Sequence, residues 1–223
     1  MRPRSAAVIV AAGSGSRLAA GLPKALVCLG GRPMLNWSVT AFGNHPQLDE
    51  LVVVVPTDQV TGIAAELSSP SVQVVAGGAS RQESVACGLA VLSDAVQHVL
   101  IHDAARPLVP TGVISAVLAA LVDGADAVVP VLPVLDTIRQ VDEDGQLLGT
   151  VDRDRLRRIQ TPQGFQLAVL RAAHAVEPAG EVTDDAALVE ALGRSVRTVP
   201  GAEAAFKITT SHDLRLAELL VAR

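Results

Sequence analysis

Apolar runs of strand length alternate with helix-like patterns along the first 130 or so residues of the chain. The expected strands are 8–12, 51–55, 72–75, 98–102 and 126–131, and the expected helices are 32–44, 58–68, 80–95 and 111–123. Strands that are apolar throughout and separated by helices are typical of parallel sheets covered on both faces. We therefore expect an α/β fold of three layers, with a mostly parallel, twisted sheet between helices. The length of 223 residues predicts a single domain, 1–223.

A protruding arm is expected where this alternation stops, after Leu132. Residues 136–158 contain two strand-like runs, TIRQV and QLLGTV, separated by Asp144-Gly145. An Asp-Gly pair between such runs is a strong signal for a β-hairpin. A two-stranded hairpin is only marginally stable by itself in water, so this arm is expected to need a partner surface.

Two further helices are expected near the end of the chain. The first begins near Thr183, with Thr183 as its N-cap and acidic residues in its first turn, and it ends at Gly193. In the second, Thr210 and Asp213 have the spacing of a capping box.

The turn after the first expected strand carries the clearest chemical signal. Gly13 and Gly15 are followed by Arg17 and Lys24. Small residues let backbone N–H groups approach a phosphate, and two cations can neutralise charge that develops on a phosphorus under attack. The carboxyl end of a strand in an open α/β sheet is also where ligands bind. The segment predicts a nucleotide site, and the alternative is a plain Gly-Ser turn between strand and helix.

Two common glycine-rich nucleotide motifs are excluded at this turn. The chain contains no G-x-x-x-x-G-K-[ST] string, which a P-loop requires. A dinucleotide fingerprint requires a third glycine at position 18, where this chain has Leu18. The acidic residue expected about 20 positions later is also missing.

Three further segments place polar groups at predicted turns. The string HDAARP delivers Asp103, which can hold Mg²⁺ together with substrate phosphates, and Arg106, which can donate two bonds to a phosphate. Gly77-Gly78 lets the backbone approach a base edge, and Ser84 adds a hydroxyl from the following helix. Lys207 lies in a strand-like segment before the last helix. The alternatives are a turn or N-cap role for the aspartate, a solvated serine, and surface positions for the two cations.

Composition limits the kinds of partner. The net charge is −5, and the chain has three Phe, one Trp and no Tyr, so a nucleic-acid partner is not expected. Cys28 and Cys87 have neither metal-ligand spacing nor a disulfide pattern, which favours a reducing compartment. The apolar stretch 6–12 is interpreted as a strand rather than a signal peptide, and no run approaches membrane-spanning length. We expect a cytoplasmic protein with no membrane partner.

The motifs together resemble the 2-C-methyl-D-erythritol 4-phosphate cytidylyltransferase family along nearly the whole chain. The strings that carry the resemblance, in the family's order and spacing, are AAGSGSR…LPK, GGASRQESV, HDAARP, DTI, TVDRDRL…TPQGF, TDDA and FKIT. The resemblance implies a Rossmann-like nucleotidyltransferase fold that uses Mg²⁺. It implies transfer of CMP from CTP to 2-C-methyl-D-erythritol 4-phosphate in non-mevalonate isoprenoid precursor biosynthesis, with CDP-methylerythritol and pyrophosphate as products. It also implies a homodimer with exchanged β-arms.

The resemblance further implies roles for individual residues. The residues implied in catalysis are Arg17, Lys24, Asp103, Arg153 and Lys207, with Asp103 also at the metal. Those implied in nucleotide binding are Ala11, Ala12, Gly13, Gly15, Gly78 and Ser84. Those implied on the acceptor side are Arg106, Thr137, Thr161 and Thr183, and the arm residues Thr137 and Arg153 would reach the partner's site. Two positions depart from the family pattern: Ala25, where Gln is common, and Ala79, where an acid often follows the glycine pair.

The chemistry can also be argued without the resemblance. A phosphate monoester has a second pKa of about 6, so at pH 7 its oxygen is mostly an anionic nucleophile that needs no general base. The enzyme has to position two anions and neutralise charge at the α-phosphorus, for which Mg²⁺, Arg17 and Lys24 are suited. Two alternatives remain: transfer to another polyol phosphate such as ribitol 5-phosphate, and a catalytically silent nucleotide-binding regulatory module. The cations at 17, 24, 106 and 207 count against the silent module.

Overall fold

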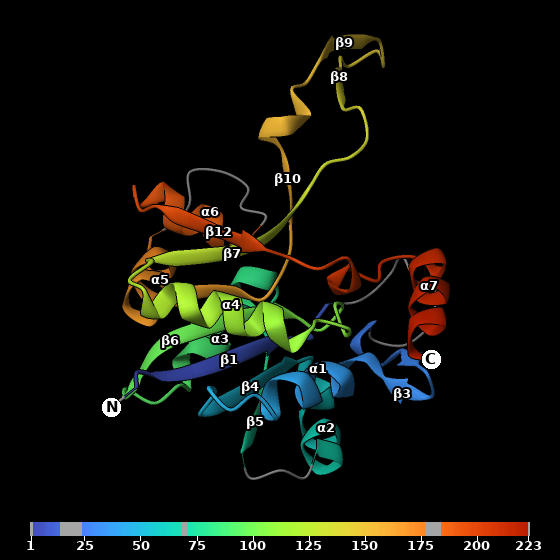
Figure 1. Ribbon diagram of the computed structural model, residues 1–223. Coiled ribbons are helices and arrows are strands. Elements are labelled where there is room, and N and C mark those ends of the chain that lie inside the picture. Colours follow the sequence, from blue (N-terminus) through green and yellow to red (C-terminus); the bar gives the residue numbers. More distant parts are fainter. Residues whose placement is uncertain (1, 14–23, 68–70, 177–183, 223) are drawn as a thin grey trace.

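A central sheet with the strand order β10-β7-β11-β6-β1-β4-β5, and with β12 alongside β7, organises the molecule (Figure 1). The computed structural model describes residues 2–13, 24–67, 71–176 and 184–222. Most strand pairs are parallel, and helices cover both faces of the sheet (Figure 1). The predicted three-layer α/β fold is therefore confirmed.

Four parallel strands in the first half of the chain lie at the predicted places, although the first runs from 4 to 10 rather than from 8 to 12. They are β1 (Arg4–Val10), β4 (Glu50–Val55), β5 (Val72–Ala76) and β6 (Val96–Asp103). Because side chains alternate along a strand, Ala7 and Ile9 of β1 join one apolar layer and Ala6 and Val8 join the other. Both layers are buried, which is why the sequence of these strands is apolar throughout rather than alternating.

Each apolar layer is completed by its own set of helices. On one face lie α1 (Met34–Gly43), α2 (Val60–Leu67), which follows η3 (Thr57–Gln59), and α4 (Thr111–Val122). On the other face lie α3 (Arg81–Ala90), α5 (Leu167–His174) and α6 (Asp185–Ala191). The predicted helices are confirmed apart from their ends: 80–95 ends at Ala90, and Arg32–Pro33 forms the short strand β3, which pairs with β2 (Cys28–Leu29).

The far side of the sheet contains strands that the sequence did not predict. Next to the expected β7 (Ala127–Pro133) lie β10 (Arg157–Ile159), β11 (Gln163–Gln166) and β12 (Val196–Pro200). β11 runs antiparallel between β6 and β7. Its sequence, QGFQ, contains a glycine because a Cβ at Gly164 would collide with Val117 and lie 2.9 Å from Leu121 Cδ1 of α4. With one apolar side chain in four residues, neither an apolar run nor an alternating pattern marks this strand.

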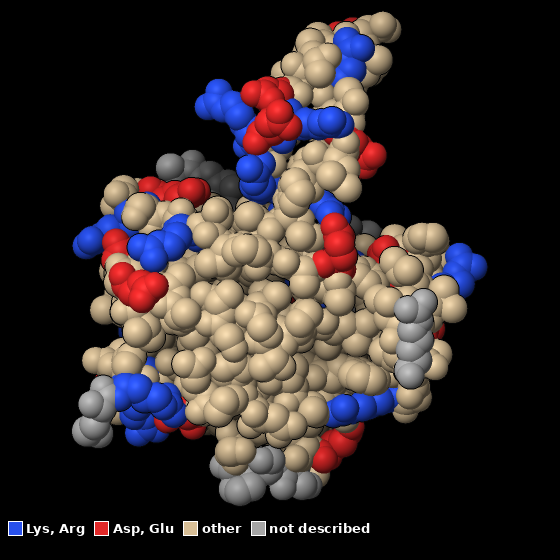
Figure 2. Space-filling model, in the orientation of Figure 1, with Lys and Arg blue, Asp and Glu red and all other residues tan. Residues whose placement is uncertain are grey.

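The predicted hairpin arm projects from the body of the molecule (Figure 1). Its strands are β8 (Arg139–Val141) and β9 (Leu147–Thr150), followed by η4 (Arg153–Arg155). At the turn Gly145 has a φ of 80°, and the Asp142 carboxylate accepts from the amides of Asp144 and Gln146. Figure 2 shows basic and acidic side chains gathered where the arm joins the body. The hairpin prediction is confirmed.

The end of the chain forms a third, smaller apolar cluster. The helix α7 (Ser211–Val221) follows η5 (Glu203–Ala205) and packs Ala217 against Leu29 and Met34. Thr210 and Asp213 form the predicted capping box. For α6 the N-cap is Asp184 rather than Thr183, which lies outside the described residues. In the part of the chain that the structure describes, no helix is both long and apolar enough to cross a membrane.

Candidate active site at the carboxyl edge of the sheet

Three charged side chains from distant parts of the chain meet at the carboxyl end of β6. Asp103 accepts at Oδ1 from Arg81 Nε (3.3 Å) and at Oδ2 from Lys207 Nζ (2.8 Å). Burial by itself would raise the pKa of Asp103, but the charges of Arg81 and Lys207 hold the pKa of this carboxyl well below its usual range. The carboxylate is therefore ionised at neutral pH. Two residues predicted for the site, Asp103 and Lys207, are brought together.

Lys207 reaches this position from an extended segment between η5 and α7, not from a strand of the sheet. The neighbouring Ile208 is buried, and its amide donates to the Ala105 carbonyl at 2.8 Å. This bond holds the segment against the HDAARP turn. The Lys207 side chain is 42% exposed, so the ammonium remains accessible to a ligand.

Arg81 is a member of this cluster that the sequence did not single out. Its Nη1 donates to Asp185 Oδ2 at 2.6 Å, and Asp185 Oδ1 lies 3.1 Å from His174 Nε2. The Asp185 side chain is only 1% exposed, so Arg81 supplies the cation that this buried carboxylate requires. Its two acidic partners stand 22 and 104 positions later in the chain. The string GGASRQESV carries no local signal for contacts over such separations.

Removing the Arg81 guanidinium is expected to lower the free energy of unfolding by about 2 to 3 kcal/mol. Arg81→Met keeps most of the side-chain stem but leaves Asp185 buried without its cation. The loss falls below the roughly 3 to 5 kcal/mol typical of fully buried pairs because the Arg81 side chain is 31% exposed. Urea unfolding measures the difference. The control is Arg4→Met, which breaks the more exposed pair with Glu50 and should cost less than about 1 kcal/mol. Equal losses in the two variants would contradict this role for Arg81.

A set of hydrogen bonds around His102 holds the HDAARP turn. Thr161 Oγ1 accepts from the Asp103 amide at 3.1 Å and lies 3.0 Å from His102 Nδ1. His102 Nε2 lies 3.2 Å from the Arg106 carbonyl oxygen. Complete burial lowers the pKa of His102 to about 3, so the ring is neutral at pH 7.

Two residues predicted for the acceptor side, Arg106 and Thr161, have partners within the protein. Arg106 donates from Nη1 to the Ala205 carbonyl at 2.9 Å and from Nη2 to the Ile159 carbonyl at 3.2 Å. Thr161 is buried, and its hydroxyl takes part in the bonds around His102. The polar groups of both residues therefore stabilise the walls of the site.

The glycine pair after β5 lies against the end of β1. The Ala11 amide donates to the Val54 carbonyl at 2.7 Å, which continues the sheet beyond β1. A Cβ at Gly77 would lie 2.7 Å from Ala12 Cβ and 2.8 Å from Ser84 Oγ, so this approach requires glycine. Segments far apart in the sequence, both predicted to bind the nucleotide, thus share one edge of the sheet.

Ser84 fixes the shape of that glycine loop. Its buried hydroxyl donates to the Ser80 carbonyl at 2.8 Å and accepts from the Gly78 amide at 3.2 Å. Gly13 follows Ala12, which contacts the loop from the end of β1. Gly13 is exposed, and a Cβ there would meet nothing within 4 Å. Among the described residues there is therefore open space beside Gly13, whereas the loop at Gly78 is held in one conformation by Ser84.

Several predicted residues are not placed at the site. Gly15, Arg17 and Thr183 lie outside the described residues, and of Lys24 only the backbone is described, at the start of η2 (Lys24–Leu26).

Thr137 and Arg153 belong to the arm, which projects from the body (Figure 1). Both are exposed, and Arg153 Nη1 donates to the Leu135 carbonyl of the arm itself. The structure does not bring them to Asp103 of the same chain.

The donor groups at the site suit a metal that is shared with a ligand. In residues 2–13, 24–67, 71–176 and 184–222, no three His, Cys, Asp or Glu side chains form a group that could hold a metal ion. Mg²⁺ commonly binds one or two carboxylates together with substrate phosphates. Each oxygen of the ionised Asp103 contacts one cation and keeps a lone pair for such a metal.

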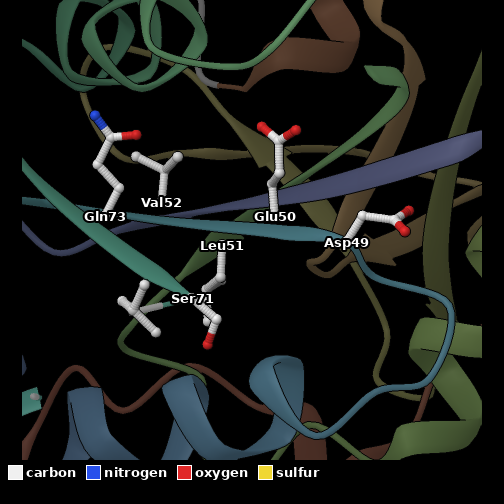
Figure 3. Close-up of a pocket in the computed structure, with 7 residues that line it drawn as sticks. Asp49, Glu50, Leu51, Val52, Ser71 and Gln73 are labelled. Atoms are coloured by element: carbon white, nitrogen blue, oxygen red, sulfur yellow. The ribbon is translucent and has the colours of Figure 1, made fainter. Parts of the chain in front are cut away.

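A hollow elsewhere on the molecule does not coincide with these motifs. It is lined by Asp49–Val52 and Ser71–Gln73, at the amino ends of β4 and β5. In Figure 3, Glu50, Val52 and Gln73 point to one side of these strands and Leu51 to the other. Because ligands of open α/β sheets bind at the carboxyl ends of the strands, we assign no function to this hollow.

A ligand that enters the carboxyl edge meets small residues at the end of β1, a fixed glycine loop and an aspartate between two cations. Fold and site together define an α/β nucleotidyltransferase. The family model for 2-C-methyl-D-erythritol 4-phosphate cytidylyltransferase matches residues 5–223, and the chain belongs to that family.

Curated relatives and solved structures agree with this assignment. A 2-C-methyl-D-erythritol 4-phosphate cytidylyltransferase of Frankia casuarinae is 51% identical over 221 residues, which cover 99% of this chain and 82% of the relative. One of Saccharopolyspora erythraea is 50% identical, covering 97% and 98% of the two chains. The crystal structure of this enzyme from Thermus thermophilus superposes with a TM-score of 0.80 at 38% identity and covers all of both chains.

Proposed function

We propose that this protein transfers CMP from CTP to 2-C-methyl-D-erythritol 4-phosphate, releasing pyrophosphate and forming CDP-methylerythritol. Membership of the family supports the reaction. The observation that carries the proposal is the ionised Asp103 held between Arg81 and Lys207 at the carboxyl edge of the sheet. The reaction joins two anions, so a site has to bring cations and an ionised metal ligand to one place.

The attacking group needs no base from the protein. The acceptor is a phosphate monoester with a second pKa of about 6, so its oxygen is mostly anionic at pH 7. His102, the histidine beside Asp103, is buried, neutral and engaged by the turn, which agrees with a mechanism without a histidine base. The protein's contribution is position and charge: Lys207 would orient the acceptor, and Arg17 and Lys24 would neutralise charge at the α-phosphorus.

The nucleotide is proposed to lie between the ends of β1 and β5. Ala11, Ala12, Gly13 and Gly15 would line the phosphate and base side, with Gly78 and Ser84 opposite. Mg²⁺, when bound by Asp103 and the triphosphate, would neutralise phosphate charge. Arg106 and Thr161 are proposed to act through the walls that they stabilise, and Thr183 to face the acceptor.

We also propose that the active form is a homodimer with exchanged arms, so that Thr137 and Arg153 complete the partner's site. The arm supports this because it exposes large apolar side chains: Leu135 (71%), Leu147 (62%), Val141 (58%) and Leu148 (44%). A hairpin of this size gains stability from a partner surface. The cysteines Cys28 and Cys87 are both free, which supports a location in the reducing cytoplasm.

Pyrophosphate release is expected with CTP, Mg²⁺ and 2-C-methyl-D-erythritol 4-phosphate, and it should stop when EDTA removes the metal. The experiment is a panel of the four nucleoside triphosphates against this acceptor and ribitol 5-phosphate. Comparable turnover with ribitol 5-phosphate would favour the other acceptor. Nucleotide binding without release in any combination would favour a silent regulatory module, and full activity in EDTA would contradict the metal ligand Asp103.

A further inference from the structure

The side chain of His102 connects both ends of the turn that presents Asp103. The turn is closed by the Arg106 amide, which donates to the Asp103 carbonyl at 2.9 Å. His102 stands immediately before it, at 0% exposure, with its ring 4.6 Å from the Phe42 ring. One ring nitrogen faces Thr161 and the other faces the Arg106 carbonyl. None of the roles proposed above uses this residue.

The direction of each hydrogen bond follows from the chemistry of its partners. A carbonyl oxygen can only accept, so His102 Nε2 carries a proton and donates it to Arg106. The Asp103 amide can only donate, so Thr161 Oγ1 accepts from it. Burial favours the neutral ring, whose Nδ1 is then an acceptor for the Thr161 hydroxyl proton. The bonds form one directed chain: Asp103 amide to Thr161, Thr161 to His102, and His102 to the Arg106 carbonyl.

We infer that His102 is a positioning residue for nucleotidyl transfer, which fixes the Asp103 carboxylate by holding the backbone on both sides of it. Among the described residues, the Asp103 oxygens accept from Lys207, which is 42% exposed, and from Arg81, which the buried Asp185 holds in place. The backbone amide, held by Thr161, is a second point at which the fold determines where the carboxylate lies. The inference rests on the proposed function and adds to it a residue that never contacts substrate.

If His102 only packed the core, its substitution would lower stability without a specific loss of kcat. His98 provides a matched control for such a packing role. His98 lies four residues earlier in the same strand, on the same face, and is also buried. Its Nδ1 has no hydrogen-bond partner among the described residues. A substitution at His98 therefore disturbs packing near β6 without touching the chain of bonds around the turn.

The test compares His102→Asn, His102→Gln and His98→Asn in the full-length enzyme. The Asn variant can keep the hydrogen bond to Thr161, and the Gln variant can keep the hydrogen bond to the Arg106 carbonyl. Each variant therefore retains one of the two hydrogen bonds that the His102 ring makes. We expect both to lower kcat by about 10²-fold, because a small displacement of a reacting group has an effect of this size. His98→Asn should lower the melting temperature as much but leave kcat within about twofold of wild type. Variants at 102 that lose only melting temperature would overturn the inference.

A double-mutant cycle tests whether His102 acts through Thr161. Thr161→Val removes the hydroxyl, and in the His102→Gln background it should lower kcat less than about threefold further, because the link is already broken. Thr161→Ser, which keeps the hydroxyl, should lower kcat much less than Thr161→Val does. Fully multiplicative effects of the two substitutions would contradict a shared chain.

The proton position can be measured without any activity. In ¹⁵N-histidine-labelled protein, the signal that His102→Asn removes from the five histidines should show a neutral ring with its proton on Nε2, protected from exchange. A proton on Nδ1 would overturn the inference. A wild-type enzyme with this tautomer but no pyrophosphate release would instead overturn the proposed function, and the positioning role with it.

Discussion

Lys24→Ala and Arg17→Ala are each expected to lower kcat by roughly 10²–10³-fold, the scale of losing one preorganised donor to a transition state. Both cations follow Gly13 and Gly15 in the sequence, shortly after the end of β1. Their effect on CTP binding should be smaller, because pairing with the phosphate charge strengthens most at the transition state. Pyrophosphate release at saturating substrates gives kcat, and calorimetry gives CTP affinity.

A matched control for these two variants is Arg4→Ala. Arg4 pairs with Glu50 at the amino end of the sheet, so its removal changes net charge without reaching the site. It should leave kcat within about twofold of wild type. If CTP binding were lost in Lys24→Ala while kcat at saturation was retained, the cation would be an anchor of the ground state only, and the proposed role would be wrong.

A mixture of two inactive variants is expected to regain about a quarter of wild-type activity. In the proposed exchanged-arm dimer each site would combine Lys24 of one chain with Arg153 of the other, so Lys24→Ala and Arg153→Ala homodimers should both be nearly inactive. When the two are refolded together, half of the dimers in a random mixture are heterodimers. Each heterodimer has one intact site and one site that lacks both residues.

The outcome of this mixing distinguishes a site completed by the partner's arm from a site formed by one chain alone. Heterodimers can be isolated with two different affinity tags and assayed directly. If they are present but no more active than the parents, both residues serve the site of one chain and the exchanged-arm dimer is wrong. The control mixes Lys24→Ala with Arg17→Ala; both residues would serve the site of their own chain, so these variants should not complement each other.

The sequence predicted the first half of the fold well because its strands are buried on both faces. Runs such as 51–55 leave few other interpretations, and Asp144-Gly145 marks its hairpin by a local requirement for positive φ. β11 was missed because its position depends on α4 rather than on its own four residues. Gly164 fits there because Val117 and Leu121 leave no room for a Cβ, a fact that depends on residues more than 40 positions away.

The same distinction applies to the site. Asp103 ends a buried strand and Gly77 fills a tight contact, so local patterns were sufficient to find them. Arg81 and His102 were missed as functional residues because their partners come from other segments. His102 looks like one more position in a buried strand until Thr161, 59 residues later, is placed beside it.

The pairing at Asp103 has a consequence for the resting enzyme. Asp103 and Asp185 balance Arg81 and Lys207, so these four paired side chains carry no net charge before any ligand arrives. A stray inorganic anion meets cations whose attraction is already largely cancelled. A metal–nucleotide complex would be different, because Asp103 would help to hold its ion and Lys207 would then be less tightly paired. On the proposed roles of Asp103 and Lys207, charge would favour binding of the nucleotide with its metal first and of the acceptor afterwards.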